Sequence, residues 1–278
     1  MDRSRPHWSY SAISQYLRCP LQYYFQRVLK LPSRTTSSGL ILGSAVHAGL
    51  AAYHVRLQQQ MAVGPAEVLQ AYHEEWAERE RTETVVYKEG ELRDDCIQQG
   101  EQLLNLYLNE APPESIVAVE QRFMVPLKNS HGDYLETPLV AITDLVTSKG
   151  TELTIQEFKT SGRAYGNSEV ETSLQPTCYV HAVKESLGVE AGVQFTVLVK
   201  TRTPKVQRLT TSRNNTDCGR LGDLVESIER AVELKVFYPV ESPLNCSGCA
   251  YRQQCNDWTR SVPEDTTLRL SEDAALLR

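Results

Sequence analysis

The sequence predicts an α/β fold in which a mixed β-sheet is flanked by helices. Helical periodicity dominates up to Pro113, strand-like segments follow from Ile116 to Thr160, and helices and strands then alternate. Helices followed by an αβββαβ succession are typical of a mixed sheet covered by helices. With 278 residues, the chain is long enough for one large domain or two small ones with a buried core.

The composition excludes several classes of protein. Hydrophobic residues make up 41% of the chain and charged residues 23%, which argues against a disordered chain, a collagen or a coiled coil. No apolar run approaches the roughly 18 residues of a membrane span, and the N-terminus lacks the apolar stretch of a secretion signal. Seven cysteines are odd in number and too few for a disulfide scaffold. We therefore expect a cytoplasmic protein whose cysteines are free thiols or metal ligands.

The first part of the chain is predicted to be helical. Ser9 or Ser11 can cap a first helix, Pro20 breaks or kinks it, and residues 21–31 continue as a second helix. A polar connection at 33–39 and three further helices follow, at 40–60, 65–81 and 92–110.

Strands and helices alternate in the second part. Lys149 and Gly150 are predicted to form the two-residue loop of a tight hairpin. The tail after Trp258 is expected to be partly disordered. The predicted strands lie at 116–127, 139–147, 153–160, 193–202 and 206–210, and the predicted helices at 172–187 and 215–236.

The net charge of −6 taken alone argues against a nucleic-acid partner, but the charged residues are unevenly distributed along the chain. Residues 1–66 carry seven Lys/Arg and one acid, and residues 191–216 carry five Lys/Arg and no acid. Two basic segments on an acidic chain can form one phosphate-binding groove, although ordinary solvated surface explains them equally well. The candidate phosphate-binding residues are Lys200, Arg202, Lys205 and Arg208.

Carboxylates interrupt the apolar faces of two neighbouring strands. The period-2 pattern of the strand at 153–160 puts Glu157 and Lys159 on the inward face. Asp144 lies in the preceding strand. The residues expected to share its face are Val140, Ile142 and Val146.

The predicted hairpin loop brings these carboxylates together. If Lys149 and Gly150 form the loop, Asp144 and Glu157 are diagonal neighbours about 7–8 Å apart, close enough to reach one ion. Carboxylates on an apolar face are costly unless a cation compensates them. A hard divalent ion such as Mg²⁺ or Mn²⁺ suits oxygen ligands. The alternative is a partly exposed Glu157–Lys159 pair and an aspartate that ends its strand.

These residues belong to a set that resembles the PD-(D/E)xK nucleases, and in particular their RecB-like branch. The set spans about residues 9 to 258 and follows the order of the family. Its members are Cys19-Pro20-Leu21-Gln22-Tyr23 (N-terminal signature), Gly43-Ser44-Ala45-Val46-His47 (histidine motif), Asp144 with Glu157-Phe158-Lys159-Thr160 (core motif), and Gln175 with Tyr179 (Gln-x-x-x-Tyr motif).

The resemblance implies a restriction-endonuclease-like core and metal-dependent cleavage of DNA. By this resemblance, His47, Asp144, Glu157 and the backbone carbonyl of Phe158 would hold Mg²⁺ or Mn²⁺. Lys159 would position the attacking water and stabilise charge on the phosphate. Gln175 and Tyr179 would brace the site or touch the DNA. Glu120 is a weaker candidate for a supporting or second-metal carboxylate, and His47 taken alone would be a packed helix histidine.

The cysteines suggest a second metal site. Cys246, Cys249 and Cys255 form a Cys-x2-Cys-x5-Cys pattern, and close thiolates in a reducing compartment usually bind metal. Cys19 is the candidate fourth ligand. Four thiolates suit structural Zn²⁺ as well as a [4Fe–4S] cluster, and spacing does not separate the two. RecB-like iron–sulfur nucleases share this split arrangement, so the resemblance favours a [4Fe–4S] cluster that pins the N-terminal helices to the C-terminal segment. The cysteines expected to be buried apolar residues are Cys96, Cys178 and Cys218.

The expected function is that of a Mg²⁺- or Mn²⁺-dependent DNA exonuclease that prefers single strands or ends, as similar-looking relatives do. The chain has no Walker-type motif, so any ATP-driven unwinding requires a partner, such as a helicase; a CRISPR adaptation partner is the other expectation. A non-catalytic, cluster-stabilised DNA-binding subunit and a duplex endonuclease are the alternatives. Four regions are expected: a helical region at 1–113, a nuclease core at 114–236, a cluster-binding segment at 237–258 and the tail at 259–278.

Overall fold

The computed structural model describes residues 6–33 and 35–258. Its main feature is a five-stranded sheet in the order β3-β4-β5-β6-β7. The β5–β6 pair is parallel and the other neighbouring pairs are antiparallel, so the sheet is mixed, as predicted. The strands are β3 (Ile116–Val125), β4 (Leu139–Lys149), β5 (Glu152–Ser161), β6 (Ala191–Val199) and β7 (Lys205–Thr211).

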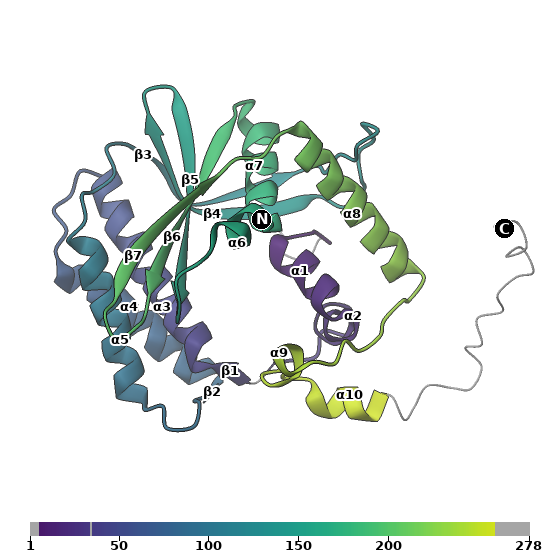
Figure 1. The fold of residues 1–278 in the computed structure, drawn as a ribbon, viewed down its shortest axis with the longest axis horizontal. Coiled ribbons are helices and arrows are strands. Elements are labelled where there is room, and N and C mark those ends of the chain that lie inside the picture. Colours follow the sequence, from purple (N-terminus) through teal and green to yellow (C-terminus); the bar gives the residue numbers. More distant parts are fainter. Residues whose placement is uncertain (1–5, 34, 259–278) are drawn as a thin grey trace, which may run out of the picture.

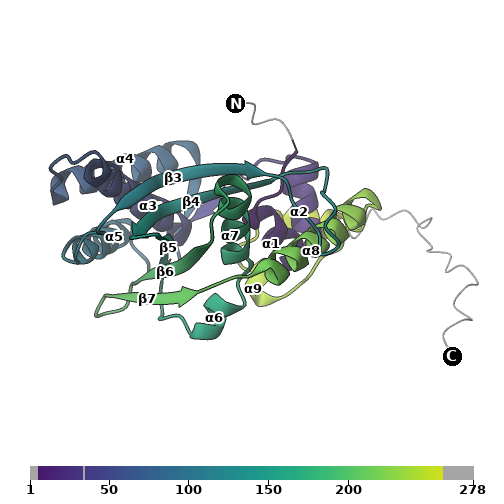
Figure 2. The ribbon, with the colours of Figure 1, turned by 90° about the horizontal axis from the view of Figure 1, so that it is seen from above.

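Helices form two apolar cores with this sheet. One group packs with Leu145, Phe158 and Leu198 of the sheet, and the other packs with residues such as Ile155 and Val193. The two groups gather in different parts of the molecule (Figures 1 and 2). The first group is α3 (Ser38–Gln58), α4 (Pro65–Thr82) and α5 (Arg93–Leu108), and the second is α1 (Tyr10–Arg18), α7 (Leu174–Leu187) and α8 (Asn215–Glu233).

The helix boundaries follow local chemistry. Ser9 caps α1, because its hydroxyl accepts a hydrogen bond from the Ala12 backbone N–H. Of the two predicted caps, Ser9 and Ser11, the structure therefore selects Ser9. Helix α7 begins at Leu174, so Pro176 lies in the first turn, where its missing N–H costs no helical hydrogen bond. Gly188 ends α7 in the left-handed conformation that glycine adopts without penalty.

Two segments near the ends of the described chain, at residues 20–31 and 237–258, pack together away from α4 and α5 (Figure 1). Leu21 donates its backbone N–H to the carbonyl of Tyr238, and the Tyr251 hydroxyl donates to the carbonyl of Leu31. Leu21, Phe25 and Tyr251 form a small buried cluster there. The elements are α2 (Pro20–Tyr23), the π-helix η1 (Tyr24–Val28), α9 (Pro243–Cys246) and α10 (Arg252–Trp258).

The hairpin between β4 and β5 corrects the predicted register. Lys149 pairs with Glu152, so Gly150 and Thr151 form the loop, one residue later than expected. Gly150 has a φ of +59° and stands at the first loop position, which is where a type II′ turn requires glycine. Continuing the ladder by one step places Asp144 directly opposite Glu157 rather than diagonal to it.

Other differences concern short elements and one side chain. The predicted connection at 33–39 contains a short strand, and the expected helix at 21–31 ends at Val28 with a π-turn. Ile142 is 47% exposed, so it does not share a buried face with Val140 and Val146. The tail after Trp258 lies outside the described residues. The elements that the sequence did not predict are β1 (Thr35–Ser37), β2 (Thr84–Val86), α6 (Asn167–Glu171), α9 and α10. In the described part of the chain, no helix has the length and apolar character to cross a membrane.

Candidate active site

The candidate site lies where β4 and β5 separate. The β4–β5 ladder ends at the pair Leu145–Gln156, beyond which β4 continues to pair with β3 and β5 with β6. Asp144 and Glu157 are the next residues of the two strands. The Asp144 Oδ2 atom accepts the backbone N–H of Phe158 at 2.8 Å. The carboxylate thus satisfies a donor that the diverging strands would leave unpaired.

His47 approaches this fork from α3. Its Nδ1 atom lies 3.3 Å from Asp144 Oδ1, and its Nε2 atom lies 3.0 Å from the carbonyl oxygen of Phe158. Both neighbours are acceptors, so both ring nitrogens are best protonated. Burial opposes the charged ring, but the Asp144 carboxylate outweighs burial and raises the pKa of His47 to about 9.

Glu157 is held by three donors. Lys159 Nζ and Gln175 Nε2 donate to its Oε1 atom at 2.6 and 2.7 Å, and the Tyr179 hydroxyl donates to its Oε2 atom at 2.7 Å. The side chain is almost fully buried. Burial and the charge of Asp144 raise the pKa of Glu157 to about 7, and Lys159 opposes that shift. The core motif and the Gln-x-x-x-Tyr motif therefore meet at one carboxylate.

Glu120 joins the site from β3. One ligand atom each of His47, Glu120 and Asp144 lies within 4.8 Å of the other two. Glu120 has a φ of +48°, an unusual conformation for a residue inside a strand. Burial and Asp144 raise the pKa of its carboxyl group. The only sequence signal for Glu120 was its place at the end of an apolar run.

These side chains face a groove of about 1190 Å³. Helix α3 and strand β1 contribute much of its lining, and Gln26 of η1 also lines it. The residues of the site that line the groove are His47, Glu120, Asp144 and Lys159. Glu157 is set behind them, in contact with Lys159.

The donor set suits a hard divalent cation. Three carboxylates crowd the fork, and Asp144 raises the pKa of both Glu120 and Glu157, which indicates a local excess of negative charge. Asp144 Oδ1 faces the Nδ1 atom of His47, and the Phe158 carbonyl faces the Nε2 atom, so each acceptor meets a different proton of the ring. A divalent cation could displace one of these protons, because carboxylate and carbonyl oxygens are the ligands that Mg²⁺ and Mn²⁺ prefer, and the imidazole would then add a nitrogen ligand.

The basic residues predicted to bind phosphate lie elsewhere. Lys200, Arg202 and Lys205 are at or beside the β6–β7 turn, and Arg208 of β7 is paired with Glu110 at 2.9 Å. None of these four cations lines the groove. Their predicted contact with DNA therefore stays a prediction.

The four cysteines predicted to bind a second metal line one small pocket. Cys19, Cys246, Cys249 and Cys255 surround it together with Phe25. Four thiols at one pocket suit a [4Fe–4S] cluster and structural Zn²⁺ alike, so the choice between these two metals stays a prediction. The remaining cysteines, Cys96, Cys178 and Cys218, are buried, as predicted.

Comparison with known proteins identifies the family. The profile of the PD-(D/E)XK nuclease superfamily matches residues 7–256. The chain therefore belongs to the PD-(D/E)XK nuclease superfamily and is a nuclease by class. No protein of curated function matches the sequence.

Solved structures add a similarity of fold. A "Putative exonuclease" from Eubacterium rectale is 12% identical, with a TM-score of 0.57 over 91% of this chain and 88% of that chain. The crystal structure of SSO0001 is also 12% identical and covers 88% of this chain and 96% of that chain, but its TM-score of 0.38 carries no further argument. The first similarity agrees with the restriction-endonuclease-like architecture expected from the sequence.

Proposed function

We propose that the chain is a Mg²⁺- or Mn²⁺-dependent deoxyribonuclease that acts as an exonuclease on single-stranded DNA or on DNA ends. The observation that carries this proposal is the meeting of Asp144, Glu157 and Lys159 at the strand fork, beside His47 and at an open groove. A domain that only binds DNA has no use for carboxylates gathered at such cost.

The proposed ligands of the cation are His47, Asp144, Glu157 and the backbone carbonyl of Phe158, with Glu120 within reach as a further carboxylate. When bound, the cation supplies positive charge to the scissile phosphate and to its attacking water. Asp144 orients the His47 ring through its contact with Nδ1.

Lys159 is the proposed catalytic cation of the chain itself. Its ammonium group lines the groove and is fixed at 2.6 Å from Glu157. There it can donate a hydrogen bond to the attacking water and stabilise negative charge that develops on the phosphate. Burial disfavours the charged amine, but Glu157 outweighs burial and raises the pKa of Lys159. The residue therefore stays cationic at neutral pH.

Gln175 and Tyr179 are proposed to position Glu157. Both side chains are buried, both donate to its carboxylate, and Gln175 also donates to the Tyr179 hydroxyl. This network fixes the Glu157 oxygens and, through them, the ammonium group of Lys159. Outer hydrogen bonds of this kind tune a metal site without touching the substrate.

The cysteine-lined pocket is proposed to hold a [4Fe–4S] cluster, with Zn²⁺ as the alternative. The resemblance to RecB-like iron–sulfur nucleases favours the cluster, which would join Cys19 near the start of the chain to the three cysteines near its end. A cytoplasmic location remains a proposal from the sequence composition, and a helicase or CRISPR adaptation partner remains a proposal from the resemblance.

The preference for single strands or ends is supported by the resemblance and by the similarity to the E. rectale protein described as a "Putative exonuclease". Blocking the 5′ end, the 3′ end or neither, and comparing these DNAs with a circle, tests it directly. An exonuclease leaves the circle intact, whereas an endonuclease opens it.

The activity itself is tested with Lys159→Ala and a matched control, Lys149→Ala, which removes an exposed lysine outside the groove. We expect Mn²⁺-dependent degradation of labelled single-stranded DNA to disappear in the first variant and to persist in the second, while both still bind DNA. Equal cleavage by Lys159→Ala would overturn the proposed centre. Binding without cleavage in the wild type would instead favour a non-catalytic DNA-binding subunit.

A further inference from the structure

The cations that line the active-site groove are already paired with carboxylates. Lys159 donates to Glu157, and Arg79 lies 2.8 Å from both Glu75 and Glu83. Within the described lining of the groove, no other lysine or arginine is present. A DNA strand carries one negative charge per nucleotide. Phosphates away from the reaction centre therefore need cations at the rim of the groove.

Arg27 is a cation without an ion-pair partner among the described residues, and it directly follows Gln26, which lines the groove. Its Nε and Nη2 atoms donate to Gln15 Oε1 at 3.1 Å and to Ser11 Oγ at 3.3 Å, and both acceptors are neutral. No carboxylate in residues 6–33 or 35–258 forms an ion pair with it. A guanidinium group has five N–H donors, so three remain after these two bonds. Their planar arrangement matches the oxygens of a phosphate.

The π-helix η1 fixes Arg27 next to the groove. Phe25 is buried against Tyr251, and Tyr24 stacks on Phe237 with ring centroids 4.6 Å apart, so the backbone of η1 is anchored on both sides. Gln26 lines the active-site groove, and the next residue, Arg27, lines a second cavity. π-Helices occur often at functional sites, where they reorient single residues.

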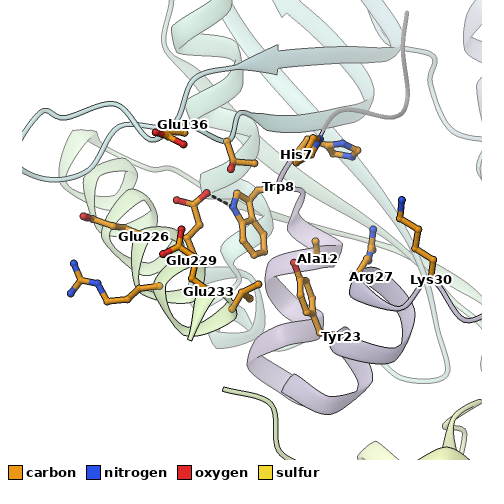
Figure 3. A pocket seen from close by; sticks show the side chains of 14 residues that line it. His7, Trp8, Ala12, Tyr23, Arg27, Lys30, Glu136, Glu226, Glu229 and Glu233 are labelled. Atoms are coloured by element: carbon orange, nitrogen blue, oxygen red, sulfur yellow. Dashed lines mark hydrogen bonds between the residues drawn. The ribbon is translucent and has the colours of Figure 1, made fainter. Parts of the chain in front are cut away.

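Figure 3 shows this second cavity, which has a volume of about 680 Å³. Arg27 and Lys30 stand on one side of it, across from glutamates of α8. Lys30, like Arg27, makes no ion pair with the part of the chain that the structure describes. Glu136 and the α8 residue Arg230 also line the cavity. Because the carboxylates outnumber Arg230 on the α8 side and repel phosphates, we expect a strand leaving the groove to follow the side with Arg27 and Lys30. The glutamates of α8 that line the cavity are Glu226, Glu229 and Glu233.

We propose that Arg27, assisted by Lys30, binds a backbone phosphate of the single DNA strand whose scissile bond lies at the fork of β4 and β5. The inference rests on the proposed nuclease function and deepens it, because it assigns the path of the substrate strand. It also moves the main phosphate contact from the β6–β7 hairpin, where the sequence placed it, to the N-terminal helical segment.

The test measures the salt dependence of binding. A fluorescent oligothymidylate is titrated with wild type and Arg27→Gln over a series of KCl concentrations, without added divalent cation, so that binding is read without cleavage. Loss of one phosphate contact reduces the slope of log K against log [KCl] by about 0.7 for a single strand. We expect this reduction and about tenfold weaker binding at low salt. Arg27→Lys keeps the charge and should keep the wild-type slope, which a purely structural role of the guanidinium does not predict.

Arg18→Gln is the matched control, because Arg18 is an exposed arginine of α1 that contacts Gln22 and lines neither cavity. An equal loss of slope in Arg18→Gln, or a loss in Lys205→Gln with none in Arg27→Gln, would overturn the proposal. Wild-type cleavage with Mn²⁺, together with an unchanged slope in Arg27→Gln, would overturn it while leaving the nuclease function intact. A wild type that neither binds nor cleaves would instead remove the function on which it rests.

Discussion

Asp144 closes the fork between β4 and β5 by accepting the backbone N–H of Phe158 at 2.8 Å, while its second oxygen faces His47 at 3.3 Å. One carboxylate thus completes the hydrogen bonding of the sheet and contributes to the proposed cation site. These two tasks can be separated by substitution.

Asp144→Asn keeps an oxygen that can accept from Phe158 but removes the charge, whereas Asp144→Ala removes both. We expect cleavage to fall in both variants by at least about 100-fold, because charge at the reaction centre is lost. Asp144→Ala should also be less stable than Asp144→Asn by about 1–3 kcal/mol, the cost of an unsatisfied buried donor. Urea unfolding without divalent cation measures the difference. Coincident unfolding curves would show that the hydrogen bond to Phe158 adds nothing.

Cation binding should release a proton from His47. The pKa of His47 is raised to about 9, so the ring is charged at pH 7 and must lose a proton before a nitrogen can bind a metal. Affinity for Mn²⁺ should therefore rise with pH between 7 and 9, by up to about tenfold per unit. Calorimetry at pH 8, where Glu157 with its pKa of about 7 is largely ionised, should find about one proton released per ion in buffers of different ionisation enthalpy. An affinity independent of pH, with no proton released, would contradict the role of His47 as a ligand.

Tyr179→Phe should lower kcat while leaving KM for DNA nearly unchanged. The hydroxyl donates to Glu157 at 2.7 Å, and Tyr179 does not line the groove. Losing one donor loosens Glu157 and should reduce kcat by about 10–100-fold. Tyr53→Phe is the control, because Tyr53 is also buried but lies in the core around α3. A raised KM with normal kcat would show that Tyr179 acts on the DNA instead.

Protein purified without oxygen should contain iron and acid-labile sulfide, about four of each per chain. Cys249→Ser should lose the iron and melt at a lower temperature, because the pocket joins distant parts of the chain. Cys96→Ser should retain the iron, since Cys96 is buried in a different core. Zinc in place of iron in the wild type would identify the alternative metal.

The long elements could be predicted from the sequence because their signals are local. Apolar periodicity places α3, α4 and α5 within a few residues of their observed ends, and Ser9 caps α1 as one of two candidates. Three-residue strands such as β1 and β2 carry too little pattern to be recognised. The hairpin register was wrong because the sequence does not say whether the glycine stands first or second in a two-residue loop.

The partners of charged residues could not be predicted, because they depend on tertiary contacts. Arg208 is a free cation by sequence, yet it pairs with Glu110 from a distant segment. Arg213 was counted among the basic residues, but its guanidinium donates to backbone carbonyls of Val170, Glu171 and Ser173 and so secures the entry to α7. Glu120 reaches the site through a positive φ, which no sequence pattern signals.

The cysteine-lined pocket is formed by sulfurs from opposite ends of the chain, and all four are partly accessible to solvent. If the proposed cluster fills this pocket, its loss to an oxidant would remove one connection between α2 and the C-terminal segment, while the hydrogen bond from Leu21 to Tyr238 and the strand pairs of the sheet would remain. The carboxylates at the fork would keep their places, but Arg27 on the adjacent η1 would be held less firmly. On the two proposals above, oxidation would therefore weaken the binding of long single strands before it affected the cleavage of the bond.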